Sequence, residues 1–429
     1  MENKQDKSIV IVGLGYVGLP LALTAAERGL RVAGFDINKE HIARLRAGKT
    51  HFRSAEVNEK VSQLYQRIEW DTDSKIIANA DAAIICVPTP VDEHHKPDLK
   101  PLIGATETVA GHMKDGQLIV VESTISPGTM EDVVLPILEK TGKKCGKDFN
   151  LAHCPERIDI GNKKYSLTTI PRVIGGITKE CTERAARMYE HIIDAPITRL
   201  KTIKAAETAK IVENTFRDVN IALVNELARA FDTMGIDILD VIRGAATKPF
   251  AFMPHYPGSG TGGHCIPVDP YYLIERSREN GFTHRFLSMA RTINEEMPAY
   301  TVQRAADALA QEGRKLMGSR IAVLGLAYKP EIDDIRESPA LVIIEILKKA
   351  GAFVDAYDPH VPASSTMQNL SAAIKDKDCI IIATAHNEFC NINAEMLKKH
   401  NVKVVVDGRN CLDKEELIAA GIIYRGIGR

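Results

Sequence analysis

Residues 8–36, SIVIVGLGYVGLPLALTAAERGLRVAGFD, contain the pattern that decides the fold. An apolar run over 8–12 predicts a strand, and it leads into the glycine pattern GxGxxG at 13–18. Residues 19–28 then have the spacing of a helix, and 31–35 form a second apolar strand. A strand, a glycine-rich turn, a helix and a strand make up the βαβ unit that binds dinucleotides, with the phosphates at the start of the helix.

Asp36 follows the second predicted strand, about twenty residues after the glycine turn. An acid at this place accepts hydrogen bonds from both ribose hydroxyls and repels a 2′-phosphate. The sequence therefore predicts NAD, rather than NADP, as the cofactor. The alternative for this residue is an aspartate that only caps a turn.

Much of this pattern recurs near the C-terminus. Predicted strands at 320–324 and 353–357 flank the turn GLAYK at 325–329 and a helix over 338–349. The second copy lacks the third glycine and carries Lys329 where the turn would meet a phosphate, so we expect it to bind a different nucleotide or none. The predicted fold class is α/β, with two Rossmann-like doubly wound domains and parallel sheets.

A long helix is predicted between the two copies. Residues 202–234 contain neither proline nor glycine, which predicts one helix of about 45–50 Å. Its apolar positions recur at helical spacing, so we expect it to be amphipathic or buried between domains. These positions are Ile211, Phe216, Val219, Leu223, Leu227 and Phe231. Helices of this length commonly support dimerisation, and we expect a homodimer through it.

The predicted domains follow from these boundaries. An N-terminal NAD-binding Rossmann domain covers 1–199, and a central helical domain with a candidate catalytic loop covers 200–313. The second Rossmann-like domain covers 314–429. A chain of 429 residues is too long for one ordinary core, which agrees with two or three domains.

The overall composition excludes several classes of protein. Hydrophobic residues make up 45% and charged residues 26% of the chain, and the net charge of -1 gives no general attraction to nucleic acid or to an anionic membrane. No apolar run approaches the roughly 18 residues of a membrane helix, and the first ten residues are polar, unlike a signal peptide. We expect a cytoplasmic protein.

Cysteine and histidine spacing gives no sign of a metal site. The eight cysteines include no CxxC pair, which suits reduced thiols rather than a zinc site or a disulfide framework. The loop Asp92-Glu93-His94-His95 could suggest a metal, but it lacks partners at helical or strand spacing. A solvated loop is the simpler interpretation, and we predict no metal site.

Residues 258–269, GSGTGGHCIPVD, place Cys265 in a glycine-rich loop four residues before Asp269. Glycines let a backbone approach a ligand closely, and a thiol in such a loop can act as a nucleophile. The alternative for Cys265 is a small buried hydrophobic residue. His264 could tune the thiol, or it could be a structural histidine.

Polar side chains on the long helix form a second candidate group. Glu207, Lys210 and Asn214 lie about one turn apart, so they share a face. A solvated stripe is the ordinary explanation, but Lys210 stands in an apolar setting where a lysine is costly unless it is paired or functional. An ammonium and an amide there could stabilise a developing oxyanion. Glu156 follows a short predicted strand, where a surface acid in a turn is the simple alternative.

Several motifs in order along the chain resemble the UDP-glucose/GDP-mannose dehydrogenase family. They are GLGYVGLPLA at 13–22, VPTP at 87–90, ESTISPGT at 122–129, CPER at 154–157, ETAKIVENTFRDVNIALVNELA at 207–228, GTGGHCIPVDPYYL at 260–273, GLAYKPEIDDIRESPA at 325–340 and DGRN at 407–410. The resemblance covers nearly the whole chain and is strongest to the branch that acts on UDP-N-acetylhexosamines.

This resemblance implies an NAD-dependent, four-electron oxidation of a sugar's C6 alcohol to a carboxylate, through a thiohemiacetal and a thioester on Cys265. It implies catalytic roles for Cys265, Lys210, Asn214, Glu156, Thr124 and Asp269. The implied NAD contacts are Gly13, Leu14, Gly15, Tyr16, Val17, Gly18, Asp36, Thr89, Ser123, Thr124 and Arg336. The implied substrate contacts are Glu156, Arg157, Lys210, Asn214, Lys248, Tyr256, Gly258, Gly260, Gly262, Tyr328, Lys329 and Arg409, with UDP in the C-terminal domain.

One departure from the family pattern bears on the substrate. The UDP-glucose branch carries a second acid four residues after its Pro-Glu motif, and here that position is Ile160. The segments GNKKYSLTTIP and KPFAFMPHYPG resemble the N-acetylated branch and favour UDP-N-acetyl-D-glucosamine. UDP-N-acetyl-D-mannosamine and UDP-glucose are the alternatives.

Two alternatives come from other functional classes. A two-electron hydroxyacid dehydrogenase would use Lys210 and Asn214 but would leave Cys265 and the third domain without a role. An NAD-sensing scaffold would use the second nucleotide-like domain as an assembly surface. Such a scaffold gives Lys329 and Arg409 no reason to bind UDP.

Overall fold

The computed structural model describes residues 6–50, 52, 54–92, 96–158, 162 and 164–429. The expectations on Glu93, His94, His95 and Ile160 lie outside these residues. The chain divides into two compact units, which are Met1–Glu213 with Tyr271–Phe282, and Asn214–Pro270 with Thr283–Arg429. The division into three domains stays a prediction.

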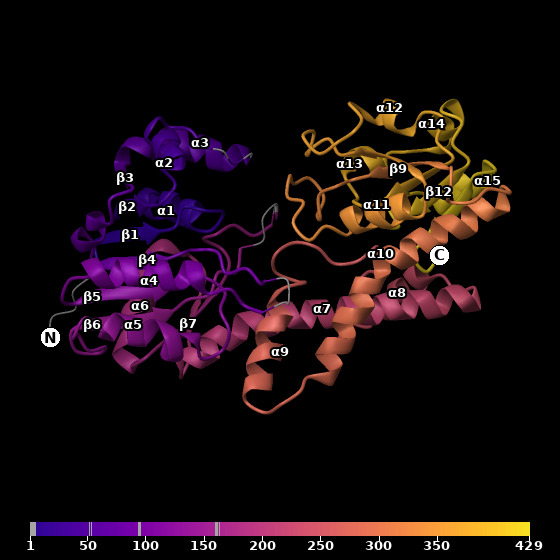
Figure 1. Cartoon of the computed structure of the whole chain (residues 1–429). Coiled ribbons are helices and arrows are strands. Elements are labelled where there is room, and N and C mark those ends of the chain that lie inside the picture. The colour runs from indigo at the N-terminus through magenta and orange to yellow at the C-terminus, as the bar shows by residue number, and fades with distance from the viewer. Residues whose placement is uncertain (1–5, 51, 53, 93–95, 159–161, 163) are drawn as a thin grey trace. The chain divides into compact units, whose positions relative to one another are not determined.

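The first unit contains a sheet in the order β3-β2-β1-β4-β5-β6-β7-β8 (Figure 1). Its strands are β1 Ser8–Val12, β2 Arg31–Phe35, β3 Ile68–Asp71, β4 Ala82–Ile85, β5 Gln117–Val121, β6 Phe149–His153, β7 Arg172–Gly176 and β8 Ile197–Arg199. Neighbouring strands are parallel except β6 and β7, which are antiparallel. The predicted parallel sheet is confirmed for β1, β2, β4 and β5, and the antiparallel pair lies beyond these strands.

Helices cover both faces of this sheet. Along β1, Ile9 and Ile11 pack in one apolar core, whereas Val10 and Val12 pack in another, because successive side chains of a strand point to opposite faces. The first core includes residues of α1, α2, α3 and α6, and the second includes residues of α4 and α5. These helices are α1 Gly18–Glu27, α2 Lys39–Arg46, α3 Ala55–Leu64, α4 Lys100–His112, α5 Leu135–Glu139 and α6 Lys179–Ile192.

The second unit contains the C-terminal sheet, whose strands are all parallel in the order β10-β9-β11-β12-β13. The strands are β9 Arg320–Leu324, β10 Phe353–Tyr357, β11 Cys379–Ile382, β12 Val404–Asp407 and β13 Ile423–Gly426. Alternate residues of β9 enter separate cores on the two faces, as in β1. The two Rossmann-like sheets predicted from the sequence are thus confirmed.

The remaining helices are α7 Ile203–Met234, α8 Ile238–Ala246, α9 Asp269–Glu279, α10 Arg285–Gln311, α11 Pro339–Lys349, α12 Leu370–Ile374, α13 Asn387–Cys390, α14 Ala394–Lys399 and α15 Lys414–Ala419. Side chains of α10 and α11 cover one face of the C-terminal sheet, and those of α12 and α14 cover the other. Short 3-10 helices occur at η1 Tyr65–Arg67 and at η2 Ser74–Asn79, and a π-helical turn at η3 Met130–Val134.

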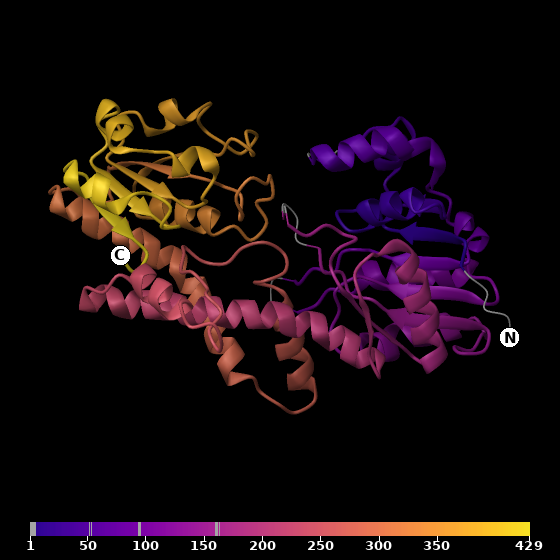
Figure 2. The same cartoon turned by 180° about the vertical axis from the view of Figure 1, so that it is seen from behind.

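The long predicted helix is confirmed as α7, which is uninterrupted from Ile203 to Met234 (Figure 2). Its burial differs from the expectation, since Phe216 and Leu223 are exposed. The buried face is instead rich in polar side chains, because the groups that pair with them come from segments far away in sequence. These buried polar residues are Glu207, Lys210, Asn214, Thr215, Asp218 and Asn225.

Within the described ranges, no helix has both the length and the apolar character that crossing a membrane requires. The eight cysteines all lie in these ranges and none is joined to another by a disulfide.

Candidate active site

The glycine turn after β1 has the shape of a phosphate-binding loop. A Cβ at Gly13 would lie 2.8 Å from the carbonyl oxygen of Cys86, and a Cβ at Gly18 would lie 1.9 Å from the carbonyl oxygen of Gly13. Only glycine fits at these two positions, which allows the turn to pack closely against α1. Gly15 is exposed, and a Cβ there would meet nothing within 4 Å. This open space above the helix N-terminus is where a pyrophosphate can approach the backbone.

Asp36 lies directly after β2 and turns its carboxylate toward this loop. One oxygen accepts a hydrogen bond from the Leu14 N–H at 2.9 Å, and the other accepts from the Asn38 N–H at 2.9 Å. Leu14 is buried, whereas Tyr16 is 41% exposed and Val17 is half-buried. The arrangement fits NAD, with Gly13–Gly18 at the phosphates and Asp36 at the ribose.

Two hydroxyl side chains join the loops that follow β4 and β5. Thr89 donates a hydrogen bond to the carbonyl oxygen of Thr124 at 2.6 Å, and Ser123 donates to that of Val87 at 2.7 Å. The loops that contain Thr89, Ser123 and Thr124 are therefore brought together at the carboxyl edge of the sheet, where ligands of such folds bind.

Lys210 and Glu156, two residues predicted separately, meet in this unit. The Lys210 Nζ lies 3.9 Å from a carboxylate oxygen of Glu156, and the two side chains are only 7% and 13% exposed. The Glu156 backbone N–H donates to the carbonyl oxygen of Glu122 at 3.2 Å, which fixes the turn after β6. A nearly buried ammonium beside a carboxylate can stabilise a developing negative charge and can exchange a proton.

A buried cluster that the sequence reasoning missed supports this turn. The Arg172 guanidinium lies 3.7 Å from the Glu122 carboxylate and donates to the carbonyl oxygen of Pro155 at 3.4 Å. Tyr189 donates to the other Glu122 oxygen at 2.5 Å. Burial raises the pKa of Glu122, and the charge of Arg172 opposes that rise. The sequence signal that could have revealed this cluster is an arginine at the first position of an otherwise apolar strand, RVIGG.

Glu207 has a structural role rather than the solvated position that was the ordinary alternative. Its carboxylate oxygens accept from the Gly128 and Met130 N–H groups at 2.7 and 2.8 Å. Burial raises the pKa of Glu207 to about 7, although the two hydrogen bonds act to lower this pKa. Glu207 thereby joins α7 to the segment ESTISPGT.

Cys265 and Asp269 lie in the second unit, at the start of α9. The Cys265 carbonyl oxygen accepts from the Val268 and Asp269 N–H groups at 3.2 and 2.9 Å, so the cysteine opens the turn that leads into α9. Asn214 donates from its amide to the Asp269 carboxylate at 2.5 Å, and Arg217 donates to the Asn214 oxygen. Asn214 and Asp269 are 1% and 2% exposed, whereas Cys265 is half-buried. The structure thus joins Asn214 to the loop that carries the thiol.

The glycines before Cys265 make room for side chains that follow β9 and β12. A Cβ at Gly258 would lie 2.8 Å from the Arg409 guanidinium, and a Cβ at Gly262 would lie 2.6 Å from the Tyr328 Cβ. Gly260 has a positive φ of 123°, which suits glycine. This loop is therefore packed against two of the predicted substrate contacts, Tyr328 and Arg409, and another, Lys329, follows Tyr328 in the chain.

Other predicted residues are bound elsewhere or exposed. Arg157 forms a two-pronged ion pair with Glu213, and Arg336 pairs with Asp334. Lys248 lies over the Phe250 ring at 4.9 Å, and Tyr256 is 60% exposed. The predicted NAD loop, Lys210 and Glu156 belong to the first unit, whereas Asn214, Cys265, Asp269, Arg336 and Arg409 belong to the second.

Comparisons with known proteins agree with this geometry. Three domains of the UDP-glucose/GDP-mannose dehydrogenase family match the chain, namely the NAD binding domain at 7–193, the central domain at 204–296 and the UDP binding domain at 322–414.

Individual relatives span nearly the full chain. UDP-N-acetyl-D-mannosamine dehydrogenase of Pyrococcus horikoshii is 38% identical over 98% of this chain and 99% of its own. UDP-N-acetyl-D-glucosamine 6-dehydrogenase of Pseudomonas aeruginosa is also 38% identical, over 92% of this chain and 94% of its own. The solved structure of the Pyrococcus horikoshii enzyme has a TM-score of 0.92 and covers 98% of this chain and 99% of its own. The solved structure of the Staphylococcus aureus UDP-N-acetyl-mannosamine dehydrogenase has a TM-score of 0.85 at 36% identity, over 98% of this chain and 98% of its own.

The phosphate loop with Asp36, the full-length similarity and the three matched domains agree with one another. The chain belongs to the UDP-glucose/GDP-mannose dehydrogenase family and is an NAD-dependent nucleotide-sugar dehydrogenase.

Proposed function

We propose that this enzyme oxidises the C6 primary alcohol of a UDP-N-acetylhexosamine to the carboxylate, using two NAD per sugar. The observation that carries the proposal is the position of Cys265. It lies in a glycine-rich loop at the turn that leads into α9, and its carbonyl oxygen accepts from Asp269, the partner of Asn214. A thiol in that setting gives a dehydrogenase a second oxidation at the same carbon.

The first oxidation needs a group that favours the alkoxide. Gly13–Gly18 and Asp36 would hold NAD, which would supply the acceptor for the hydride that leaves C6. Lys210 and the Asn214 amide stabilise the negative charge on the C6 oxygen, and Thr124 helps to position the sugar. The proton of the alcohol leaves through Lys210 or through a water, and an aldehyde results.

The second oxidation uses the cysteine. The Cys265 sulfur bonds to the aldehyde carbon, and the thiol proton passes to the oxygen, so the carbon again carries a hydroxyl and a hydrogen. Loss of the second hydride gives a thioester. Glu156 assists a water that attacks this thioester, which releases the carboxylate and restores the thiol. Overall, one alcohol, two NAD⁺ and one water give one carboxylate, two NADH and three protons.

The second unit supplies groups suited to a nucleoside diphosphate. Burial lowers the pKa of Arg409, so a bound pyrophosphate would stabilise its charged form. Lys329 provides a second cation for the phosphates, and the loop 256–262 provides backbone for the sugar. Calorimetric titration with UDP tests this assignment, because neither a hydroxyacid dehydrogenase nor an NAD-sensing scaffold has a reason to bind UDP. Absence of UDP binding would favour those alternatives.

The identity of the sugar rests on the comparisons and on the sequence. Relatives of equal identity act, by their names, on UDP-N-acetyl-D-glucosamine and on UDP-N-acetyl-D-mannosamine. The segments around 161–171 and 248–258 favour the gluco sugar, and the structural similarity to the Pyrococcus horikoshii enzyme favours the manno sugar. Turnover with UDP-N-acetyl-D-glucosamine, UDP-N-acetyl-D-mannosamine, UDP-N-acetyl-D-galactosamine and UDP-glucose separates them. The N-acetylated sugars should be oxidised with the higher kcat/KM, and a preference for UDP-glucose would refute the N-acetyl assignment.

Cys265→Ser tests the mechanism. A serine hydroxyl is a much weaker nucleophile, so overall carboxylate formation should fall by about a thousandfold or more, while NAD still binds. Cys390→Ser, which changes a cysteine of the same unit outside the proposed site, serves as the matched control and should keep its activity. Wild-type rates in the Cys265→Ser variant would sink the thioester mechanism.

A further inference from the structure

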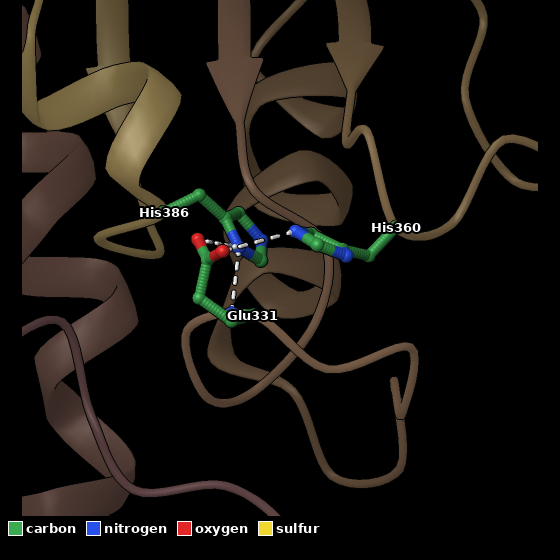
Figure 3. Close-up of side chains that lie close together, drawn as sticks. All are labelled: Glu331, His360 and His386. Atoms are coloured by element: carbon green, nitrogen blue, oxygen red, sulfur yellow. Dashed lines mark hydrogen bonds and ion pairs between the residues drawn. The ribbon is translucent and has the colours of Figure 1, made fainter. Parts of the chain in front are cut away.

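A group of three metal-ligating side chains lies in the C-terminal sheet domain, apart from the residues of the proposed site. Glu331, His360 and His386 each offer a ligand atom, and these atoms lie within 4.8 Å of one another. The Glu331 carboxylate is 3.8 Å from the His360 Nε2 and 3.7 Å from the His386 Nδ1. Figure 3 shows the carboxylate and the two rings gathered at one point, from three separate segments of the chain.

Asp358 fixes the positions of both histidines. One of its oxygens accepts from the His360 backbone N–H at 2.8 Å, and the other lies 3.0 Å from the His386 Nε2. That second oxygen also accepts from the Leu326 and Ala327 N–H groups, and Asp358 is fully buried. Since a carboxylate only accepts hydrogen bonds, the His386 Nε2 carries the hydrogen and its Nδ1 presents a lone pair toward Glu331. A carboxylate behind a histidine in this way is the usual support of a metal ligand.

The His386 Nδ1 has one partner that an ion would replace. It accepts a hydrogen bond from the Glu331 backbone N–H at 2.9 Å. Glu331 has a positive φ of 63°, an unfavourable conformation for a residue other than glycine. Ion binding would require this backbone to shift so that the N–H leaves the lone pair.

The donor set decides the kind of ion. Two imidazoles and one carboxylate suit zinc and related divalent transition metals, whereas calcium and magnesium prefer oxygen ligands. The Glu331 and His360 side chains are 46% and 35% exposed, which gives an ion a path from solvent and leaves room for a water ligand. We propose that Glu331, His360 and His386 bind one divalent transition-metal ion of the zinc type.

Such an ion would join the loops that follow β9, β10 and β11. Glu331 lies two residues after Lys329, so the ion would also hold the loop that we assign to the substrate's phosphates. That consequence rests on the proposed function, whereas ion binding itself does not. The test therefore uses no substrate, and its failure leaves the dehydrogenase proposal untouched.

Calorimetric titration of Zn²⁺ into the chelator-treated, untagged full-length chain tests the site. We expect the wild type to bind one ion per chain. The His360→Ala variant should bind none, or should bind it at least about tenfold more weakly. Glu331→Gln, which keeps an oxygen for the Asn387 N–H now bound at 2.9 Å, should weaken binding similarly. His400→Ala, a histidine of the same domain outside the cluster, should bind like the wild type.

Cobalt substitution and heat stability give two independent readouts. Bound Co²⁺ should give visible absorption bands without a thiolate charge-transfer band, because no cysteine belongs to the proposed ligand set. Zn²⁺ should raise the Tm of the wild type and of His400→Ala more than that of His360→Ala. Equal Zn²⁺ affinity in the wild type and in both cluster variants, or a thiolate band in the wild type, would overturn the proposal.

Discussion

At the scale of single residues, His153 makes the free energy of unfolding depend on pH. It ends β6 and is fully buried, and this burial lowers the pKa of His153 to about 3. Below about pH 6.5 the unfolded chain binds a proton at this histidine that the folded chain does not bind. Acidification must therefore lower the free energy of unfolding.

His153→Leu should remove this part of the acid sensitivity. Between pH 7.5 and pH 5 the wild type should lose about 2 kcal/mol more of its free energy of unfolding than the variant does. Urea denaturation at the two pH values measures the difference. Parallel losses in both proteins would show that His153 takes up its proton without unfolding.

Gly15 allows folding and cofactor binding to be separated. A Cβ there meets no atom within 4 Å, so Gly15→Ala should leave the Tm within a few degrees of the wild type. The added methyl group lies where the pyrophosphate approaches the backbone, so the Kd for NAD should rise by about tenfold or more. Fluorescence titration with NAD measures this change.

Gly104→Ala, in α4, is the matched control, because that glycine is also exposed and has open space around its Cβ position. It should bind NAD as the wild type does. Unchanged NAD affinity in Gly15→Ala would contradict the assignment of the pyrophosphate to this turn.

At the scale of elements, the turn that carries Glu156 depends on a buried ion pair between β7 and the end of β5. Arg172 and Glu122 are 1% and 0% exposed. Arg172→Met leaves the Glu122 carboxylate buried without its cation and should cost about 3 kcal/mol of unfolding free energy. Adding Glu122→Gln should recover much of this loss, since the remaining pair is uncharged.

Urea denaturation of the two single variants and the double variant measures this coupling. A double variant as unstable as the sum of the two single losses would mean that Arg172 and Glu122 act independently.

The βαβ unit and the ends of α7 could be predicted from the sequence, whereas the buried face of α7 could not. The glycine pattern 13–18 and Asp36 specify a local βαβ unit, because every group involved lies within about thirty residues. The ends of α7 were predicted within one residue from the absence of proline and glycine. Its buried face was not predicted, because Glu207 pairs with backbone at Gly128 and Met130, and Asn214 pairs with Asp269.

The candidate site was predictable residue by residue but not in its pairings. The sequence identified Lys210 and Glu156 separately, and their approach to 3.9 Å follows from the packing of α7 near the end of β6. Arg172 and the cluster of Glu331, His360 and His386 were missed, since each depends on segments distant in sequence and carries no spacing motif. These groups required tertiary structure.

At the scale of the whole molecule, α7 exposes an apolar stripe. Val212, Phe216 and Leu223 are 51%, 46% and 52% exposed and recur at helical spacing on one face. We propose that this stripe is the dimer contact, since a second copy of the chain would cover it. Sedimentation equilibrium should then give twice the chain mass of 47.1 kDa.

Leu223→Glu should shift the monomer–dimer equilibrium toward the monomer. A carboxylate buried in the dimer contact would lose its hydrating water molecules. Thr233→Glu, an exposed polar position on the same helix, should leave the dimer intact. A wild-type mass of one chain would refute the dimer and leave the exposed stripe unexplained.

The central claim is that one enzyme carries a single carbon through two oxidations. The most direct measurement is the amount of NADH formed when a limiting, known quantity of the preferred UDP-sugar is consumed to completion with excess NAD. Two NADH per sugar, with a carboxylate product in mass spectrometry, is the result we predict. One NADH per sugar, with an aldehyde product, would contradict the thioester role of Cys265.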